Sequence, residues 1–142
     1  MASWDPGSFT AGLIAEMRAH GGVPSKGPFA GRRLLILTTT GARSGEPRIA
    51  VLAYRLEGET MIVAGSKGGA PTHPGWFFNL RANPVATAEV NNELVQVAAR
   101  IEAEGPERDR LWAKHVAEMP GFGEYPAKTD RIIPMVVLTR TA

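Results

Sequence analysis

Short apolar runs separated by turn-forming residues dominate this chain and limit the folds open to it. The runs are rich in β-branched and aliphatic residues and are bounded mostly by Gly, Pro or Asn, as is typical of strands. The predicted strands cover residues 34–40, 48–56, 60–65, 85–90, 94–101 and 132–138. Because parallel strands need a helical crossover at nearly every step, this succession favours an antiparallel barrel over a doubly wound sheet.

Helical patterns are few. Residues 9–20 place apolar side chains at helical spacing, and Pro74 and Pro106 are each suited to the first turn of a further helix. We therefore expect a mainly β protein of about six antiparallel strands and three helices. Pro134 predicts that the last strand lies at a sheet edge or a bulge.

The length of 142 residues fits one compact unit. We expect residues 1–30 to form an N-terminal helix and connector, and residues 31–142 to form the barrel domain. No apolar run approaches the roughly 18 residues of a membrane span. The N-terminus also lacks a signal-peptide core, so we expect a cytoplasmic protein without stable membrane insertion.

Positive charge is concentrated in the first part of the chain. Residues 18–81 hold nine Lys/Arg against three Asp/Glu, a net +6, whereas residues 82–142 hold seven against nine, a net −2. An anionic ligand is therefore expected in the front half. The basic residues are scattered and no RNA-binding or helix-turn-helix signature accompanies them, so nucleic acid is not an expected partner.

The first segment that can carry chemistry is the turn between the first two predicted strands, residues 38–48. Its two glycines are expected to expose backbone N–H groups, and Arg43 and Arg48 flank the turn. Together these donors suit a phosphate or carboxylate. A hairpin loop with solvated arginines is the alternative interpretation.

The second segment, residues 64–80, joins a strand end to a helix start. Its glycines let a planar ligand approach the backbone closely, and Ser66 and Lys67 add polar groups. A flexible loop that leads into a helix burying Trp76 and Phe77 is the alternative.

The third segment, residues 119–131, is predicted to be a loop able to cover a ligand as a lid, with Tyr125 offering a phenol; a packed connector is equally compatible. Cysteine is absent and the histidines at 20, 73 and 115 lack metal-ligand spacing. We assign no metal, and we expect isolated histidines to be surface or capping residues.

Three strings taken in order, TTTGARSGEPR, SKGGAPTHPGWFFNLRANP and KTDRIIP, resemble the deazaflavin-dependent nitroreductase family over about residues 30–140. The resemblance implies a split β-barrel related to FMN-binding, pyridoxamine-phosphate-oxidase-like proteins. It also implies that reduced coenzyme F420, a 5-deazaflavin, lies in a groove along the barrel.

The resemblance assigns cofactor contacts position by position. Arg43, Ser44 and Arg48 would hold the phosphate and oligoglutamate tail. The phosphate and deazaflavin would be lined by Ala64, Ser66, Lys67, Gly68 and Gly69. Trp76 would lie beside the ring, either as a wall of the pocket or in the core.

The resemblance further implies that the cofactor donates a hydride, while the protein supplies geometry and charge stabilisation. Ser66 and Tyr125 are the catalytic candidates. We hypothesise that either residue hydrogen-bonds the acceptor and that Tyr125 or solvent delivers the balancing proton.

Activated C=C bonds in enones or coumarin-like lactones, and quinones, are the expected acceptors. Nitro compounds are a weaker expectation, because Met119 and Phe122 stand where nitroimidazole-activating members carry tyrosines. A deazaflavin carrier or sequestering protein, and an FMN- or haem-binding split barrel, share the same signals and remain alternatives. Related barrels often dimerise, so a homodimer is compatible with the sequence.

Overall fold

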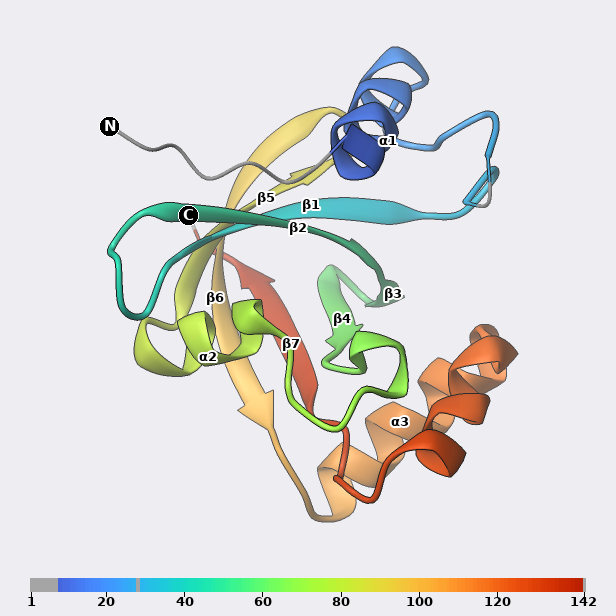
Figure 1. The fold of residues 1–142 in the computed structure, drawn as a ribbon, viewed down its shortest axis with the longest axis vertical. Helices are drawn as coiled ribbons and strands as arrows, with labels where there is room; N and C mark the ends of the chain where they lie inside the picture. The colour runs from blue at the N-terminus through green and yellow to red at the C-terminus, as the bar shows by residue number, and fades with distance from the viewer. Residues whose placement is uncertain (1–7, 28, 142) are drawn as a thin grey trace.

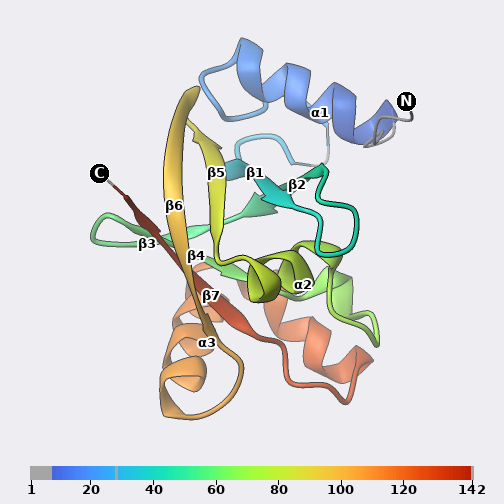
Figure 2. The same ribbon diagram turned by 90° about the vertical axis from the view of Figure 1, so that its left-hand side faces the viewer.

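A single antiparallel sheet organises the computed structural model, which describes residues 8–27 and 29–141. The sheet has seven strands in the order β2-β1-β5-β6-β7-β4-β3 (Figures 1 and 2). The strands are β1 (Leu34–Thr40), β2 (Pro47–Ala53), β3 (Arg55–Glu57), β4 (Thr60–Ala64), β5 (Val85–Val90), β6 (Glu93–Glu102) and β7 (Met135–Arg140). The expected antiparallel class is confirmed, with one strand more than predicted.

The extra strand arises at Tyr54. Residues 48–56 were predicted as one strand, but the chain breaks at Tyr54 so that β2 pairs with β1 and β3 pairs with β4. Strands β2 and β3 are the two ends of the sheet order and only one residue separates them. The sheet must therefore curl until its edges approach each other, as a split barrel requires.

Several strands have continuous apolar sequences because their side chains alternate between two faces of the sheet that are both buried. On β1, Leu35 and Leu37 belong to the central core, whereas Leu34 and Ile36 belong to a second cluster on the opposite face. Successive strand residues point to opposite faces. Both faces of β1 are thus buried, and no polar residue interrupts the run at residues 34–37.

Three α-helices in the described residues, α1 (Ser8–Ala19), α2 (Gly75–Ala82) and α3 (Pro106–Glu118), cover this sheet. Helix α1 packs Ile14 and Met17 on the outer face of β1. Helix α3 places Leu111 with Ile133 and other residues on the outer face of β4 and β7. In Figures 1 and 2 these two helices lie at opposite ends of the molecule.

Helix α2 belongs to the barrel core itself. Trp76, Phe77 and Leu80 join the central cluster. The helix begins directly after Pro74, whose ring fixes a backbone angle suited to a helix start. Because α2 lies across one opening of the curled sheet (Figure 2), its first residues lie near the loops that carry the candidate site.

Two sequence predictions need correction near the C-terminus. Residues 119–131 were predicted as a loop, but Pro120–Lys128 form a 3₁₀ segment, η2. Pro134 was predicted to mark an edge or a bulge, yet β7 lies between β6 and β4. Pro134 precedes β7, and its carbonyl accepts a hydrogen bond from the Gly65 amide. The lack of an N–H group at Pro134 therefore removes no hydrogen bond from the β-ladder.

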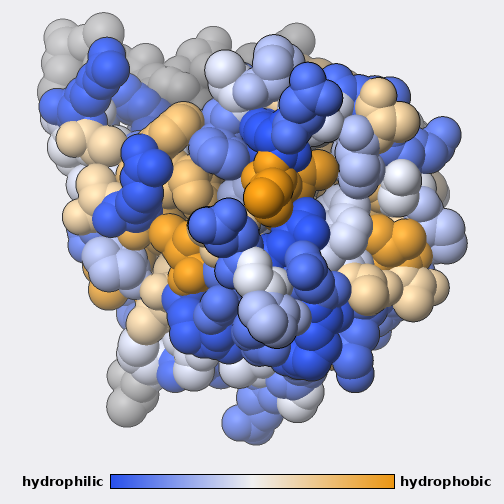
Figure 3. Space-filling model, turned by 90° about the horizontal axis from the view of Figure 1, so that it is seen from below, coloured by the Kyte–Doolittle hydropathy of each residue, from blue (hydrophilic) through white to orange (hydrophobic). Residues whose placement is uncertain are grey.

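Figure 3, which views the molecule from below, shows hydrophilic residues over most of that face, with hydrophobic residues in small separate patches. Within the described residues, no helix is both long and apolar enough to span a membrane.

Candidate functional site

Two adjoining cavities form one groove beside β2. The hairpin cavity, of about 930 Å³, lies between the β1–β2 loop and α2. The lid cavity, of about 1160 Å³, lies between the connector before β1, the β4–α2 loop and η2. Ala50 and Trp76 line both cavities. We call the two cavities together the groove.

The hairpin cavity holds the first set of predicted cofactor residues, Arg43, Ser44 and Arg48. The Ser44 hydroxyl oxygen accepts hydrogen bonds from the Glu46 amide at 3.1 Å and from Arg48 Nη2 at 3.3 Å. Both contacts use the oxygen as an acceptor, so the Ser44 hydroxyl proton is left to donate. The structure brings these residues together as the sequence predicted.

The glycine amides of this loop behave differently from the prediction. The Gly41 N–H donates to the Glu46 carbonyl at 2.8 Å, and the Gly45 N–H donates to the Gly41 carbonyl at 2.9 Å. These amides close the hairpin and are therefore not available to a ligand. The side chains of Arg43, Ser44 and Arg48 still offer donors at this cavity.

Asn79 fixes the hairpin loop against α2. Its side-chain carbonyl accepts a hydrogen bond from the Ala42 amide at 2.9 Å, and its Nδ2 donates to the Thr39 hydroxyl at 3.0 Å. Asn79 is itself buried. Asn79 was not among the predicted site residues, because its two partners lie about 40 residues earlier in the chain.

The lid cavity holds Ala64, Ser66 and Lys67 of the second predicted segment. Ala64 ends β4, and Lys67 opens the short 3₁₀ turn η1 (Lys67–Gly69). Lys67 has φ +45°, a left-handed conformation that is unfavourable for a residue with a Cβ. Its Nζ donates to the Thr72 hydroxyl at 3.3 Å. The backbone here is held in a costly shape that presents a lysine to the cavity.

Of the two glycines of this turn, Gly69 does not line either cavity. Gly68 lies within η1. Gly69 has φ +81°, and a Cβ at this position would come within 2.9 Å of Lys128 Cβ. Glycine at 69 therefore allows the turn to pack closely against η2.

Trp76 satisfies both interpretations given for it. The side chain is only 8% exposed and belongs to the central core, yet it lines both cavities at their junction. A large aromatic side chain held by the core gives the groove a rigid wall.

Tyr125 and Ser66, the two catalytic candidates, lie in the same cavity. The Tyr125 ring packs edge-on against Phe122 at a centroid distance of 5.4 Å, and Lys128 Nζ lies 5.8 Å from its centroid. The Phe122 ring in turn contacts the His115 ring at 4.6 Å. The lid segment is thus held by a row of rings that runs from α3 to the cavity.

Several cations of the groove lack a carboxylate partner. Arg43 and Arg81 line the hairpin cavity, and Arg32 and Arg33 line the lid cavity. In the part of the chain that the structure describes, no ion pair joins any of these arginines to an Asp or Glu. Their charge is available to an anionic ligand.

Arg32, Arg33 and Arg81 line the groove but were not among the predicted site residues. Arg81 lies on α2 with its guanidinium 5.0 Å from the Phe78 ring centroid. The guanidinium of Arg33 lies 5.9 Å from the Tyr54 ring. The adjacent Arg32 and Arg33 were a visible signal in the basic front half, but only the fold shows that they join the lid cavity.

Tyr54 is a further missed residue. It is 3% exposed and lines the lid cavity at the bend between β2 and β3. Burial raises the pKa of its phenol, against the opposing influence of Arg33. Tyr54 therefore carries a neutral phenol at neutral pH.

His115 contradicts the surface or capping role that was expected of the histidines. His115 is fully buried on α3, and neither ring nitrogen has a hydrogen-bond partner. Burial, with the nearby Arg55 charge, lowers its pKa to about 4. Among the described residues, no group of three His, Cys, Asp or Glu side chains could hold a metal ion.

Comparisons with known proteins identify relatives of this arrangement. The family model described as F420H(2)-dependent quinone reductase matches residues 13–140. The F420H(2)-dependent quinone reductase Rv1261c of Mycobacterium tuberculosis (strain ATCC 25618 / H37Rv) is 38% identical over 108 residues, which cover 75% of this chain and 72% of the relative.

Solved structures agree with this result. A structure described as the F420-H2 dependent reductase FDR-A is 38% identical, with a TM-score of 0.68, and the match covers 76% of this chain and 95% of that one. Another, described as a domain-swapped dimer, is 34% identical with a TM-score of 0.69 and covers 92% of this chain and 95% of that one.

A more distant likeness supports the fold alone. A structure described as a putative pyridoxamine 5'-phosphate oxidase from Listeria innocua is 10% identical, with a TM-score of 0.54 over 95% of each chain. The expected split-barrel class is thereby confirmed. Given the family match over most of its length, the chain belongs to the F420H(2)-dependent quinone reductases, oxidoreductases whose cofactor is reduced coenzyme F420.

Proposed function

We propose that the groove binds reduced F420 and positions it to reduce a quinone. One observation carries the proposal: four arginines that form no ion pair with a carboxylate among the described residues line a single groove whose junction is walled by Trp76, and they are Arg32, Arg33, Arg43 and Arg81. F420 combines a planar ring with a phosphate and an anionic glutamate tail. A groove with unpaired cations and an aromatic wall fits both parts of that molecule.

The hairpin cavity suits the anionic tail and phosphate. Arg43 and Arg48 present guanidinium groups, and the Ser44 hydroxyl has a proton left to donate. Arg81 adds a further charge from α2. Charge-assisted hydrogen bonds of this kind contribute about 1.5–3 kcal/mol each.

The lid cavity suits the phosphate and the ring end. Lys67 offers a flexible ammonium beside Ala64 and Ser66, and Gly69 lets η1 pack closely against η2. Gly68, in the same turn, is proposed to line the phosphate with them. Trp76 walls the junction between this cavity and the hairpin cavity. When bound, reduced F420 supplies the hydride for a two-electron reduction.

Ser66 and Tyr125 are proposed to hydrogen-bond the acceptor while negative charge develops on its oxygen. Both line the lid cavity, and both carry a hydroxyl group. Tyr125 or solvent is proposed to deliver the balancing proton. Tyr125→Phe should lower turnover while cofactor affinity stays unchanged, and equal turnover would leave Tyr125 a packing residue.

Quinones are the first acceptor class that we propose, in keeping with the names of the family and of its relatives. The apolar side chains of Leu52, Met119 and Phe122 line the lid cavity and suit a ring-shaped acceptor. Enones and coumarin-like lactones present similar conjugated carbonyl groups and form the second class. Nitro compounds are the third.

We also propose a homodimer, supported by the relative that is described as a domain-swapped dimer. Light scattering coupled to size-exclusion chromatography would test the assembly. A mass near 30 kDa would support the dimer, since one chain has a mass of 15.2 kDa; a monomer mass would contradict it.

The test of function is a titration of the purified protein with oxidised F420 and, separately, with FMN. Oxidation of reduced F420 is then followed with quinones, enones, coumarins and nitroaromatics. The proposal predicts preferential F420 binding and fast oxidation that depends on a quinone. Binding without turnover on any acceptor would indicate a carrier, and tighter binding of FMN would overturn the proposed role of the groove.

A further inference from the structure

Arg131 makes the densest set of side-chain hydrogen bonds near the groove. Its guanidinium donates to the carbonyls of Gly65 at 3.0 Å, Ser66 at 2.7 Å and Ala70 at 2.8 Å. A fourth contact joins its Nη1 to His73 Nδ1 at 3.0 Å. These partners all lie within residues 65–73, which we call the phosphate loop because it carries the proposed phosphate-binding Lys67.

The contact with His73 defines the state of that imidazole. An arginine side chain remains charged and can only donate, so Nδ1 of His73 must accept and the ring must be neutral with its proton on Nε2. Burial, with the charges of Arg131 and Arg81, also lowers the pKa of His73. The three carbonyls and the neutral imidazole can therefore all accept hydrogen bonds from the Arg131 guanidinium, which is always positively charged.

The phosphate loop needs such support because its backbone is strained. Lys67 has a positive φ although it is not a glycine, and such residues persist only where their surroundings fix them. Two turn bonds within the loop contribute, from the Gly69 amide to the Ser66 carbonyl and from the Ala70 amide to the Lys67 carbonyl. Arg131 holds carbonyls on both sides of Lys67 and completes this restraint.

Arg131 lines neither cavity. Any influence on a ligand must therefore pass through the loop that it holds. The same C-terminal segment also packs against the start and the middle of the loop, because Pro134 lies against Gly65 and Lys128 lies against Gly69. The stretch from η2 to β7 forms a template for the phosphate loop, with Arg131 at its centre.

We propose that Arg131 is a positioning residue that sets the conformation of the phosphate loop and, through Lys67, the affinity of the groove for F420. The second half rests on the proposed function, whereas the first half concerns the cofactor-free protein. Lysine in place of Arg131 would keep the charge but lose the planar fork that reaches three carbonyls at once. Charge alone is therefore insufficient.

The first experiment measures hydrogen exchange of the cofactor-free protein in Arg131→Lys and, as the matched control, Arg110→Lys. Arg110 also holds several acceptors with its guanidinium fork, those of Glu57 and Glu107, and it lines neither cavity. Arg131→Lys should speed exchange at the Gly69 and Ala70 amides by on the order of tenfold while strand amides stay protected. Arg110→Lys should leave the loop unchanged.

The second experiment measures F420 affinity in a double-mutant cycle with Lys67→Ala. Arg131→Lys should weaken binding about tenfold in the wild-type background and less than about threefold when Lys67 is already absent. Independent, additive losses would overturn the link through Lys67. Unchanged loop exchange, or faster exchange throughout the protein, would overturn the positioning role. Failure of the wild type to bind F420 would reject the proposed function while the exchange result still decides the role of Arg131.

Discussion

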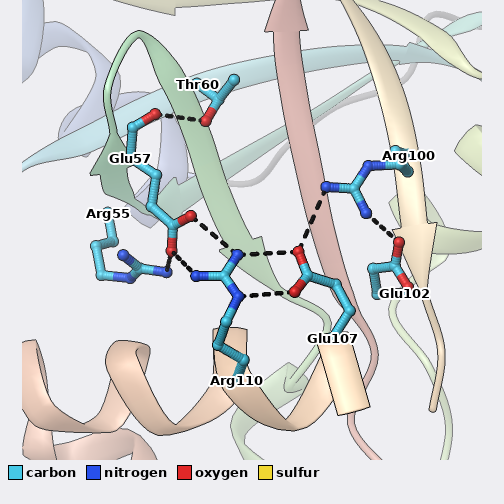
Figure 4. Close-up of polar contacts among 7 residues, drawn as sticks. All are labelled: Arg55, Glu57, Thr60, Arg100, Glu102, Glu107 and Arg110. Atoms are coloured by element: carbon cyan, nitrogen blue, oxygen red, sulfur yellow. Dashed lines mark hydrogen bonds and ion pairs between the residues drawn. The ribbon is translucent and has the colours of Figure 1, made fainter. Parts of the chain in front are cut away.

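The arginines of β3, β6 and α3 differ sharply from those of the groove. Arg110 bridges Glu57 and Glu107, with N–O distances of 3.1 and 2.7 Å, and Arg55 and Arg100 each pair with a carboxylate as well. Figure 4 shows these side chains as one continuous network of alternating charge. In the groove, Arg32, Arg33, Arg43 and Arg81 have no such partner in the described part of the chain.

We interpret this difference as one between charges that stabilise the fold and charges that are proposed to bind a ligand. In the network, burial raises the pKa of Glu57, but hydrogen bonds from Arg110 and Arg55 outweigh that effect and leave it below its usual value. The charges are neutralised within the protein. In the groove, Arg32, Arg33, Arg43 and Arg81 form no ion pair within the described residues, although Glu118 and Glu124 also line the lid cavity, so their charge can attract an anionic ligand.

Removing charge from the groove should have the largest effect. The double variant Arg43→Gln/Lys67→Gln should weaken F420 binding by about 100-fold or more, because each charge-assisted hydrogen bond contributes about 1.5–3 kcal/mol. Isothermal titration calorimetry would measure the affinity. Arg100→Gln is the control from the network and should leave affinity unchanged; comparable weakening in both proteins would remove the distinction between the two regions.

Acid should lower the free energy of unfolding through His115, which is influenced by the network residue Arg55. The unfolded chain binds a proton near the usual pKa of 6.5, whereas folded His115 does so only near pH 4. Its contribution to stability is therefore present above pH 6.5 and is lost as the pH falls toward 4, a total of roughly 3 kcal/mol. Urea unfolding at pH 7 and 4.5 would measure the free energy of unfolding.

A variant without the imidazole isolates this effect. His115→Leu should lose about 2–3 kcal/mol less stability than the wild type between those two pH values, because no proton is taken up at this position on unfolding. At pH 7 it should fold normally, since neither ring nitrogen of His115 has a partner to lose. A pH dependence equal to that of the wild type would refute the assignment.

Breaking the network should cost stability but not cofactor affinity. Glu57→Gln leaves Arg55, which is only 4% exposed, without its carboxylate, and we expect a loss of about 2 kcal/mol. Thermal and urea unfolding would measure it. Glu102→Gln, at the exposed end of the network, should cost less than about 0.5 kcal/mol. A marked loss of F420 binding in Glu57→Gln would show that the two regions are not independent.

The smallest expected effect concerns backbone strain in the groove. Lys67→Gly should be more stable than Lys67→Ala by about 1 kcal/mol, because glycine adopts the positive φ of this position without the Cβ penalty. Both variants should lose F420 affinity equally, since both lack the ammonium. A more stable alanine variant would indicate that the left-handed conformation is not required.

The strands could be predicted because apolar runs and turn residues mark them directly. The Asn91-Asn92 turn shows this well: both residues have positive φ, as a two-residue hairpin loop requires. The break at Tyr54 could not be predicted, since neither Gly nor Pro marks it and Arg55 and Leu56 continue a strand-like sequence after the apolar run 49–54. Pairing with two different partner strands causes the break, and that is a property of the closed sheet.

Motifs local in sequence predicted the candidate site residues, and their contacts with the cofactor stay a prediction. Arg43, Ser44, Arg48, Ser66 and Lys67 all line the groove. The anchors Asn79 and Arg131 act on partners far away in the chain, so their contacts exist only in the folded protein. For His115 a signal was present: it lies four residues after the buried Leu111, on the same helix face.

The measurement that most directly tests the role of the groove compares binding of complete F420 with binding of the deazaflavin nucleoside that lacks the phosphate and glutamate tail. Both ligands would be titrated at low and high salt. The account predicts that the nucleoside binds at least about 100-fold more weakly, and that salt weakens binding of F420 alone. Equal affinities with no salt dependence would show that the unpaired arginines do not hold the cofactor.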